Sequence, residues 1–132
     1  MGLTVQLSDH FRALFANLPD GDKVKIAEFI KHCQDRGFDG LCGKLVHTKN
    51  VPGTDPDYNE KYRFAVDHYL WHYHIGIPVY TLPRNAWSNY LTSDWVLHLQ
   101  RFPGDKVIRI VDLDFHDPMH MPKLDHLVFS QP

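Results

Sequence analysis

The chain has 132 residues, 43% of them hydrophobic and 23% charged, which is the balance of an ordinary globular domain. A formal charge of −2 argues against binding nucleic acid through bulk positive charge, and the apolar runs are too short for a transmembrane helix. The sequence has only two cysteines and lacks the pattern of a signal peptide, so we expect one cytoplasmic domain over residues 1–132 without membrane contact.

The N-terminal third is predicted to form a helical hairpin. Ser8 is a suitable N-cap for a first helix that runs to about Asn17, with apolar residues at helical spacing. A turn over residues 19–22 leads into a second helix from about Lys23 to Arg36, which Gly37 ends as a C-terminal glycine. The short turn makes the two helices antiparallel neighbours.

The remaining chain is predicted to be mainly β. Segments rich in aromatic and β-branched residues favour strands over residues 69–76, 95–102 and 107–116, and Leu45–His47 is expected to begin an earlier strand. Residues 58–67 fit either a short helix or an irregular segment, and residues 121–129 favour a short helix. The sum predicts an α+β fold, in which the helical hairpin precedes a small antiparallel sheet of three or four strands and a short C-terminal helix.

The central strand carries the most unusual pattern in a chain that has ten histidines. Because side chains alternate across a strand, Trp71, Tyr73 and Ile75 share one face, and His72 and His74 share the other, about 7 Å apart. We expect the two histidines to face away from the N-terminal helices. Paired imidazoles bind a metal, act as acid and base, or grip phosphate when protonated, but a pair of half-exposed strand histidines is the simpler alternative.

The strand predicted over residues 107–116 alternates in the same way. The apolar side chains on one face are those of Val107, Val111, Leu113 and Phe115. The polar side chains on the other face are those of Asp112, Asp114 and His116. The two aspartates either orient a histidine or simply face water, and solvent exposure is the simpler alternative.

Three local patterns follow one another in an order that resembles a known family. They are the helical pair with its glycine-containing link at 37–45, the segment Leu70–Gly76 (LWHYHIG), and the strand pair 93–99 and 107–113 that leads to His116. Together they cover about residues 7–127 and are similar to the RelE-type superfamily of bacterial toxins, within it the YafO-like branch. The resemblance implies the RelE-like fold.

The resemblance also implies a function. Members of the family cleave RNA, usually mRNA on the ribosome, and are neutralised by a cognate antitoxin. This chain would then be the toxin of a type II toxin–antitoxin pair, an endoribonuclease with antitoxin and RNA as its partners. His72 and His74 match the basic positions of the family's central strand, and His116 matches the residue after its final strand.

Such cleavage needs no metal or other cofactor. The 2′-OH of RNA attacks the adjacent phosphate when one group removes its proton, positive charge holds the phosphate oxygens, and an acid protonates the leaving oxygen. Histidines at 72, 74 and 116 supply base and acid, and Arg101 or Arg84 is expected to hold the phosphate.

Further residues are candidates for binding the substrate. Trp87 is able to stack on a base, His98 lies on the facing strand, and His120 follows the last strand as a helper of His116. Four of the candidate site residues also have a purely structural alternative. Arg101 would be a surface charge, His98 a solvated strand residue, and His116 and His120 parts of a polar turn.

Two rival functions remain open at the level of sequence. A His-ligated metalloenzyme would use His72, His74 and His116 as a three-histidine ligand set, although the glutamate that usually follows such a pair is absent. A non-catalytic protein-binding module of the same fold is the other alternative.

Overall fold

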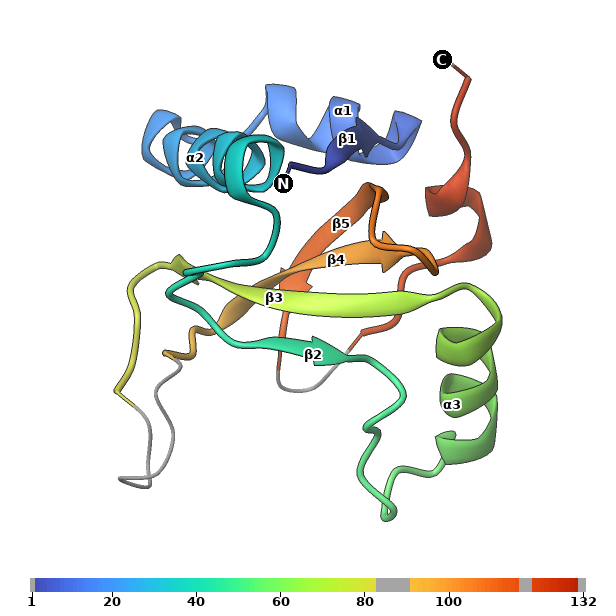
Figure 1. The fold of residues 1–132 in the computed structure, drawn as a ribbon. Helices are drawn as coiled ribbons and strands as arrows, with labels where there is room; N and C mark the ends of the chain where they lie inside the picture. Colours follow the sequence, from blue (N-terminus) through green and yellow to red (C-terminus); the bar gives the residue numbers. More distant parts are fainter. Residues whose placement is uncertain (1, 83–90, 117–119, 131–132) are drawn as a thin grey trace.

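The computed structural model describes residues 2–82, 91–116 and 120–130, which form a twisted sheet with helices on both sides (Figure 1). The elements in chain order are β1 (Thr4–Leu7), α1 (Asp9–Ala16), α2 (Asp20–Arg36), β2 (Leu45–His47), α3 (Tyr58–Asp67), β3 (Leu70–Ile77), β4 (Trp95–Arg101), β5 (Val107–Phe115) and the 3-10 helix η1 (Leu124–Leu127). None of the described helices is long and apolar enough to cross a membrane.

The sheet has five strands in the order β1-β5-β4-β3-β2 and is mixed. Strands β2 to β5 pair antiparallel, whereas β1 pairs parallel with β5 from Thr4 opposite Val107 to Leu7 opposite Ile110. The molecule is α+β, but the predicted arrangement of a leading helical hairpin with three or four antiparallel strands is wrong. A four-residue segment carries little strand signal of its own, because its stability comes from hydrogen bonds to a partner about a hundred residues away.

The N-terminal helices begin and end for local reasons. The Ser8 side chain accepts a hydrogen bond from the backbone N–H of Phe11 at 3.1 Å, which confirms its role as the N-cap of α1. Helix α2 begins at Asp20 rather than near Lys23, because the segment predicted as a turn already forms its first helical turn after Pro19, with acidic residues favourably placed there.

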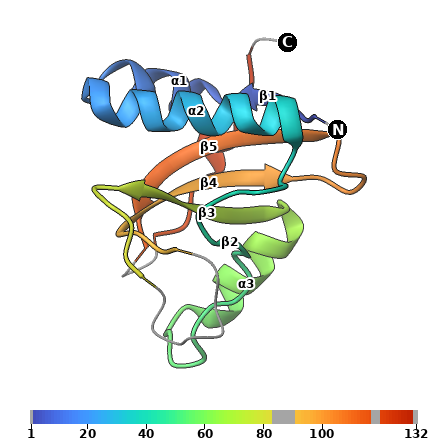
Figure 2. The same cartoon turned by 60° about the vertical axis from the view of Figure 1, so that its left-hand side comes forward.

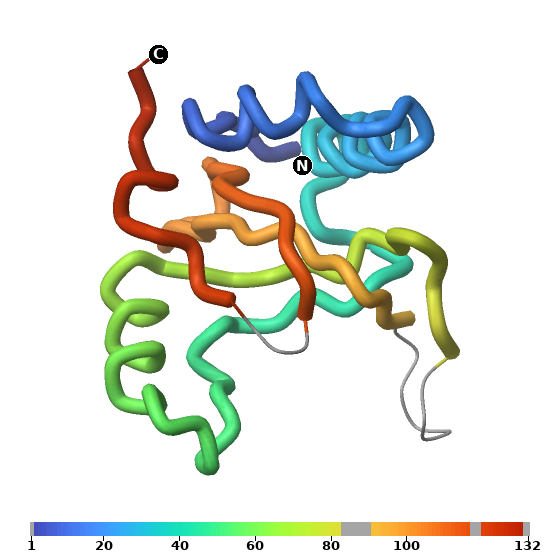
Figure 3. Tube along the Cα trace, turned by 180° about the vertical axis from the view of Figure 1, so that it is seen from behind, coloured from blue at the N-terminus to red at the C-terminus, as the bar shows by residue number. Residues whose placement is uncertain are grey.

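The structure also decides the two uncertain segments. Tyr58–Asp67 is helical and forms α3, but residues 121–129 contain only the single 3-10 turn η1, so the predicted C-terminal helix is wrong. The chain stays extended after η1 because it is bound to the start of α1: Val128 accepts a hydrogen bond from the Asp9 N–H at 3.0 Å, and the Ser130 N–H donates to the Asp9 carboxylate at 3.0 Å. Figure 3 shows the C-terminal segment running beside α1.

Two apolar clusters lie on opposite faces of the sheet. The larger one packs α1 and α2 against β3, β4 and β5, and in it the rings of Phe29 and Tyr73 stack at 4.6 Å (Figure 2). The smaller one joins Ala65 of α3 to Leu70 and Val111. Because Tyr73 faces the helices, its neighbours on β3 face away from them, as predicted for His72 and His74.

A β-bulge changes the faces of the last strand. The register between β4 and β5 shifts between His98 and Leu99, so Asp112 stands opposite His98 and Ile110 opposite Leu99. Val111 therefore joins the smaller cluster, while Leu113 belongs to the larger one. The prediction that Val111 and Leu113 share a face is wrong because a bulge inserts one residue into the alternation.

Candidate functional site: a three-histidine cluster on the sheet

Three histidines meet on the face of the sheet opposite α1 and α2. His72 and His74 come from β3 and His116 from the residue after β5, and one ring nitrogen of each lies within 4.8 Å of those of the other two. The ring centroids are 4.7 Å apart for His74 and His116, 5.4 Å for His72 and His116, and 5.9 Å for His72 and His74. We call these residues the three-histidine cluster.

The pairing of the strands explains why this set converges. Strand β4 pairs antiparallel with both β3 and β5, so β3 and β5 run in the same direction. Val96 of β4 stands opposite His74 on one side and Asp114 on the other, and His116 follows Asp114 by two residues. The N–H of His116 donates to the carbonyl of Asp94 at 2.8 Å, which fixes the end of the strand over the two histidines of β3.

Neighbouring polar groups hold one nitrogen of each β3 histidine. His72 Nδ1 lies 3.0 Å from the Thr48 hydroxyl, and His74 Nδ1 lies 3.0 Å from both the backbone N–H and the carbonyl of Ser93. These contacts orient both rings and leave the Nε2 atoms for the cluster. Which hydrogen bonds the imidazoles donate depends on their tautomers.

The segment before β2 brings a positive charge to the cluster. The carbonyl of Lys44 accepts a hydrogen bond from the N–H of His74 at 3.0 Å, and a Cβ on Gly43 would meet the His74 carbonyl oxygen at 1.9 Å. A side chain at Gly43 would therefore displace this segment from β3. Sequence analysis missed Lys44, because nothing in a glycine–lysine pair predicts which strand it approaches.

Burial keeps two of the imidazoles uncharged. Burial, together with the neighbouring histidines and Lys44, lowers the pKa of His72 to about 2 and that of His74 to about 4, although the hydrogen bond with the Ser93 backbone raises the pKa of His74. Side chains at His72 and His74 are buried, whereas His116 is half-buried and Lys44 is exposed. The cluster thus has two neutral imidazoles inside and opens toward solvent beside His116.

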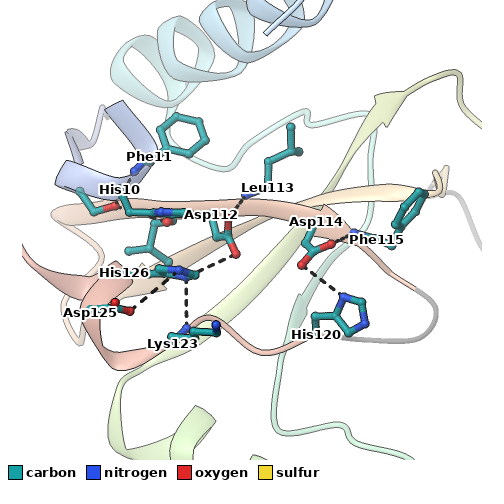
Figure 4. A network of polar contacts seen from close by, with 12 residues as sticks. His10, Phe11, Asp112, Leu113, Asp114, Phe115, His120, Lys123, Asp125 and His126 are labelled. Carbon is teal, nitrogen blue, oxygen red and sulfur yellow. Dashed lines mark hydrogen bonds and ion pairs between the residues drawn. The ribbon is translucent and has the colours of Figure 1, made fainter. Parts of the chain in front are cut away.

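A second group of histidines surrounds Asp112 on the same sheet (Figure 4). His10 Nε2 of α1 lies 3.0 Å from Asp112 Oδ1, and His126 Nδ1 of η1 lies 3.6 Å from Oδ2. The two imidazole rings stack with centroids 3.6 Å apart and 10° between their planes. Asp112 is buried, not facing water, and we call this group the Asp112 cluster. No pattern in the sequence predicts the Asp112 cluster, because its members come from three segments that are far apart in the chain.

His98 lies between the two groups. It stands opposite His72 on one side and Asp112 on the other, and it is fully buried. Neither of its ring nitrogens has a hydrogen-bond partner among residues 2–82, 91–116 and 120–130. Burial lowers its pKa to about 4, despite the opposing effect of Asp112 and Asp114. His98 is therefore a neutral core residue that no longer fits a solvated strand position.

Two other predicted site residues, Arg101 and His120, pair with carboxylates outside the three-histidine cluster. Arg101 pairs with Asp105 at 2.8 Å and lies over the rings of Phe38 and Trp71, so its guanidinium is engaged on the face that carries α1 and α2. His120 Nδ1 lies 3.4 Å from Asp114 Oδ2. Arg84 and Trp87, which were predicted to bind substrate, lie outside the described residues.

Comparison of the chain with protein-family models, with curated proteins and with solved structures finds no match.

Proposed function

We propose that the protein is an endoribonuclease that cleaves RNA at the three-histidine cluster without a metal. The observation that carries the proposal is the convergence of His72, His74 and His116 on one face of the sheet, two buried neutral imidazoles beside a half-buried one. Sequence resemblance to the RelE-type toxins supplies the substrate class. We further propose that the protein acts in the cytoplasm, where mRNA on the ribosome is its target and a cognate antitoxin its inhibitor.

The cluster provides a base for the first half of the reaction. The neutral imidazole of His74 accepts the proton of the RNA 2′-OH through its Nε2, because its pKa of about 4 makes it a stronger base than His72, whose pKa is about 2. The 2′-oxygen then forms a bond to the adjacent phosphorus. Thr48 and Ser93 hold the opposite nitrogens and so keep the accepting nitrogens in place.

The half-buried side of the cluster provides the acid and the charge. As the bond from phosphorus to the 5′-oxygen breaks, a protonated His116 donates to the leaving oxygen, and the products are a 2′,3′-cyclic phosphate and a 5′-hydroxyl. Lys44 balances the charge of the phosphate oxygens, and it takes the place that sequence analysis assigned to Arg101 or Arg84. Base and acid each contribute about 10²–10⁴-fold to such a reaction.

Cleavage of RNA by the purified protein tests the proposal. We expect wild type to cleave mRNA, alone or on ribosomes, and His116→Ala and His74→Ala to lose at least about 100-fold in rate. His32→Ala is the matched control, because His32 lies half-buried on α2, on the other side of the sheet. EDTA is expected not to lower the rate. If folded His116→Ala and His74→Ala proteins, checked by circular dichroism, cleave as fast as the control, the proposal is wrong.

Growth and complex formation test the toxin role separately. Induction of wild type should arrest growth, and co-expression of a neighbouring gene for an antitoxin should restore growth and yield a stable complex. An antitoxin segment that covers the cluster is expected to carry carboxylates, since a site for phosphate also attracts them. Growth arrest that persists in the His116→Ala protein would contradict the role of the cluster.

A further inference from the structure

We propose that the three-histidine cluster is also a site for one Zn²⁺ ion, bound by His72, His74 and His116, and that the bound ion blocks RNA cleavage. The binding itself stands on the geometry alone, while the block rests on the proposed function. A zinc-inhibited site would make the protein sensitive to the free zinc concentration.

The distances allow three nitrogens to reach one ion. Tetrahedral zinc with bonds of about 2.0–2.1 Å places its ligand nitrogens about 3.3 Å apart. The three nitrogens lie within 4.8 Å of one another, so each pair needs to approach by at most about 1.5 Å. His72 and His74 lie within β3, whereas His116 follows the end of β5 and is half-buried, so we expect the His116 side chain to make this approach.

The contacts around the rings are those that zinc-binding histidines need. A histidine that binds a metal through one nitrogen usually donates the other N–H to an oxygen, which fixes its tautomer and orientation. The Thr48 hydroxyl at 3.0 Å from His72 Nδ1 and the Ser93 carbonyl at 3.0 Å from His74 Nδ1 are such oxygens. In the tautomer that carries the proton on Nδ1, both rings present Nε2 to the ion, and for His74 this tautomer donates to the Ser93 carbonyl instead of accepting from the Ser93 N–H.

The ligand chemistry selects the class of ion. Neutral imidazole favours zinc and neighbouring transition metals, whereas Mg²⁺ and Ca²⁺ favour oxygen ligands, and this ligand set contains no carboxylate. Three histidines leave a fourth position for water.

The Asp112 cluster does not qualify as an ion site, although its ligand atoms also lie within 4.8 Å of one another. Its two rings are stacked nearly parallel, so their lone pairs do not converge on one point. Asp112 Oδ1 already accepts hydrogen bonds from His10 at 3.0 Å and from the N–H of Leu113 at 2.9 Å. Mutual contacts account for this group without an ion.

Zinc binding would stop cleavage for a direct reason. Coordination uses the same nitrogens that would accept and donate protons, and an imidazole bound to zinc carries no free lone pair. RNA cleavage should therefore fall with the fraction of protein that holds zinc, and removal of zinc should restore it.

Metal titration of the EDTA-treated, dialysed protein tests the site. We expect wild type to bind about one Zn²⁺ per chain by calorimetry and to give the visible absorption of tetrahedral Co²⁺ when Co²⁺ is the probe. His116→Ala and His74→Ala should each bind at least about 100-fold more weakly, and Thr48→Val, which removes only the oxygen beside His72, about 10-fold more weakly. His126→Ala of the Asp112 cluster is the matched control and should bind like wild type.

The outcomes separate this inference from the proposed function. Binding that is absent, or that is equal in wild type and folded His116→Ala, overturns the zinc site. If zinc binds as expected but the zinc-free protein cleaves no RNA, the site stands and the metal-free endoribonuclease is wrong. If added zinc is required for cleavage, the site stands but the inhibitory role is wrong. If zinc binds at one equivalent and lowers the cleavage rate in proportion, both proposals are supported.

Discussion

The Asp112 cluster and the three-histidine cluster lie on one sheet but differ in the groups that contact the ring nitrogens of their histidines. In the Asp112 cluster a buried carboxylate lies within 3.0 Å of one imidazole and 3.6 Å of the other, and the rings stack. In the three-histidine cluster, the contacts to Thr48 and Ser93 hold only one nitrogen of each β3 ring. A carboxylate satisfies its histidines, whereas the ring nitrogens of three imidazoles that face one another can be bridged by a substrate or an ion.

The angles between the rings reinforce the contrast. The planes of the stacked pair differ by 10°, but those of the three-histidine cluster differ by 47° to 65°. Stacked rings gain contact area and hold α1 and η1 together, whereas tilted rings direct their edges toward a common point. We therefore expect the Asp112 cluster to contribute stability and the three-histidine cluster to contribute function, and the four predictions below test this division.

The largest expected difference is in catalysis. His116→Ala should lower the rate of RNA cleavage by about 10²–10⁴-fold, because it removes the acid, whereas His10→Ala should change the rate less than about twofold. Rates measured on folded proteins under single-turnover conditions check the pair. A comparable loss in both variants would contradict the division between the clusters.

The next largest effect is acid destabilisation by the buried imidazoles. Burial lowers the pKa of His74 and His98 to about 4 and that of His72 to about 2, so the unfolded chain binds their protons first, near pH 6.5, while the folded chain does not. Stability is then full above about pH 6.5 and falls as the pH drops toward 4, by about 2–3 kcal/mol for each of the three groups at pH 4.5. Urea unfolding at pH 7.5, 6, 5 and 4.5 measures the slope, and a stability unchanged down to pH 5 would contradict it.

A smaller effect is expected from breaking the Asp112 cluster. Asp112→Ala removes the acceptor for His10 and for the Leu113 N–H, and leaves both donors without that partner. We expect a loss of about 2–3 kcal/mol in the free energy of unfolding, with the zinc affinity unchanged. Thr48→Val is the opposite case, since it should weaken zinc binding more than it lowers stability. Denaturant titration measures the free energy of unfolding of both variants, and metal titration measures their zinc affinity.

The sequence contains the alternation that defines the three-histidine cluster but not the pairing that completes it. Period-2 alternation predicts that His72 and His74 share a face, and the same rule applies to Asp114 and His116. Their meeting depends on β4 lying between β3 and β5, which the alternation within one strand does not predict. The depth of burial was not predictable, because it depends on what covers the sheet face.

Other features had no local signal at all. Strand β1 needs β5 as a partner, and the bulge at Val111 depends on how β4 and β5 pair, so neither follows from a short window of sequence. The Asp112 cluster joins residues from α1, β5 and η1 that are up to 116 positions apart, from His10 to His126. Side chains alternate along a strand, so Arg101, three residues after His98, lies on the opposite face from His98. On that face its guanidinium lies over the rings of Trp71 and Phe38.

The smallest expected effect concerns His98, which separates the two clusters and belongs to neither. Its imidazole is fully buried, and the described residues offer no hydrogen-bond partner to either nitrogen. A leucine of similar volume avoids the cost of burying those polar atoms, so His98→Leu should raise the free energy of unfolding by about 1 kcal/mol at pH 7.5. The same substitution removes one of the three groups that bind protons on unfolding, so the gain should grow toward pH 5. Zinc affinity should not change, because His98 is not among the three ligands. A loss of stability at pH 7.5 would mean that His98 makes a favourable polar contact in solution, and a loss of zinc affinity would mean that it supports the cluster beside it.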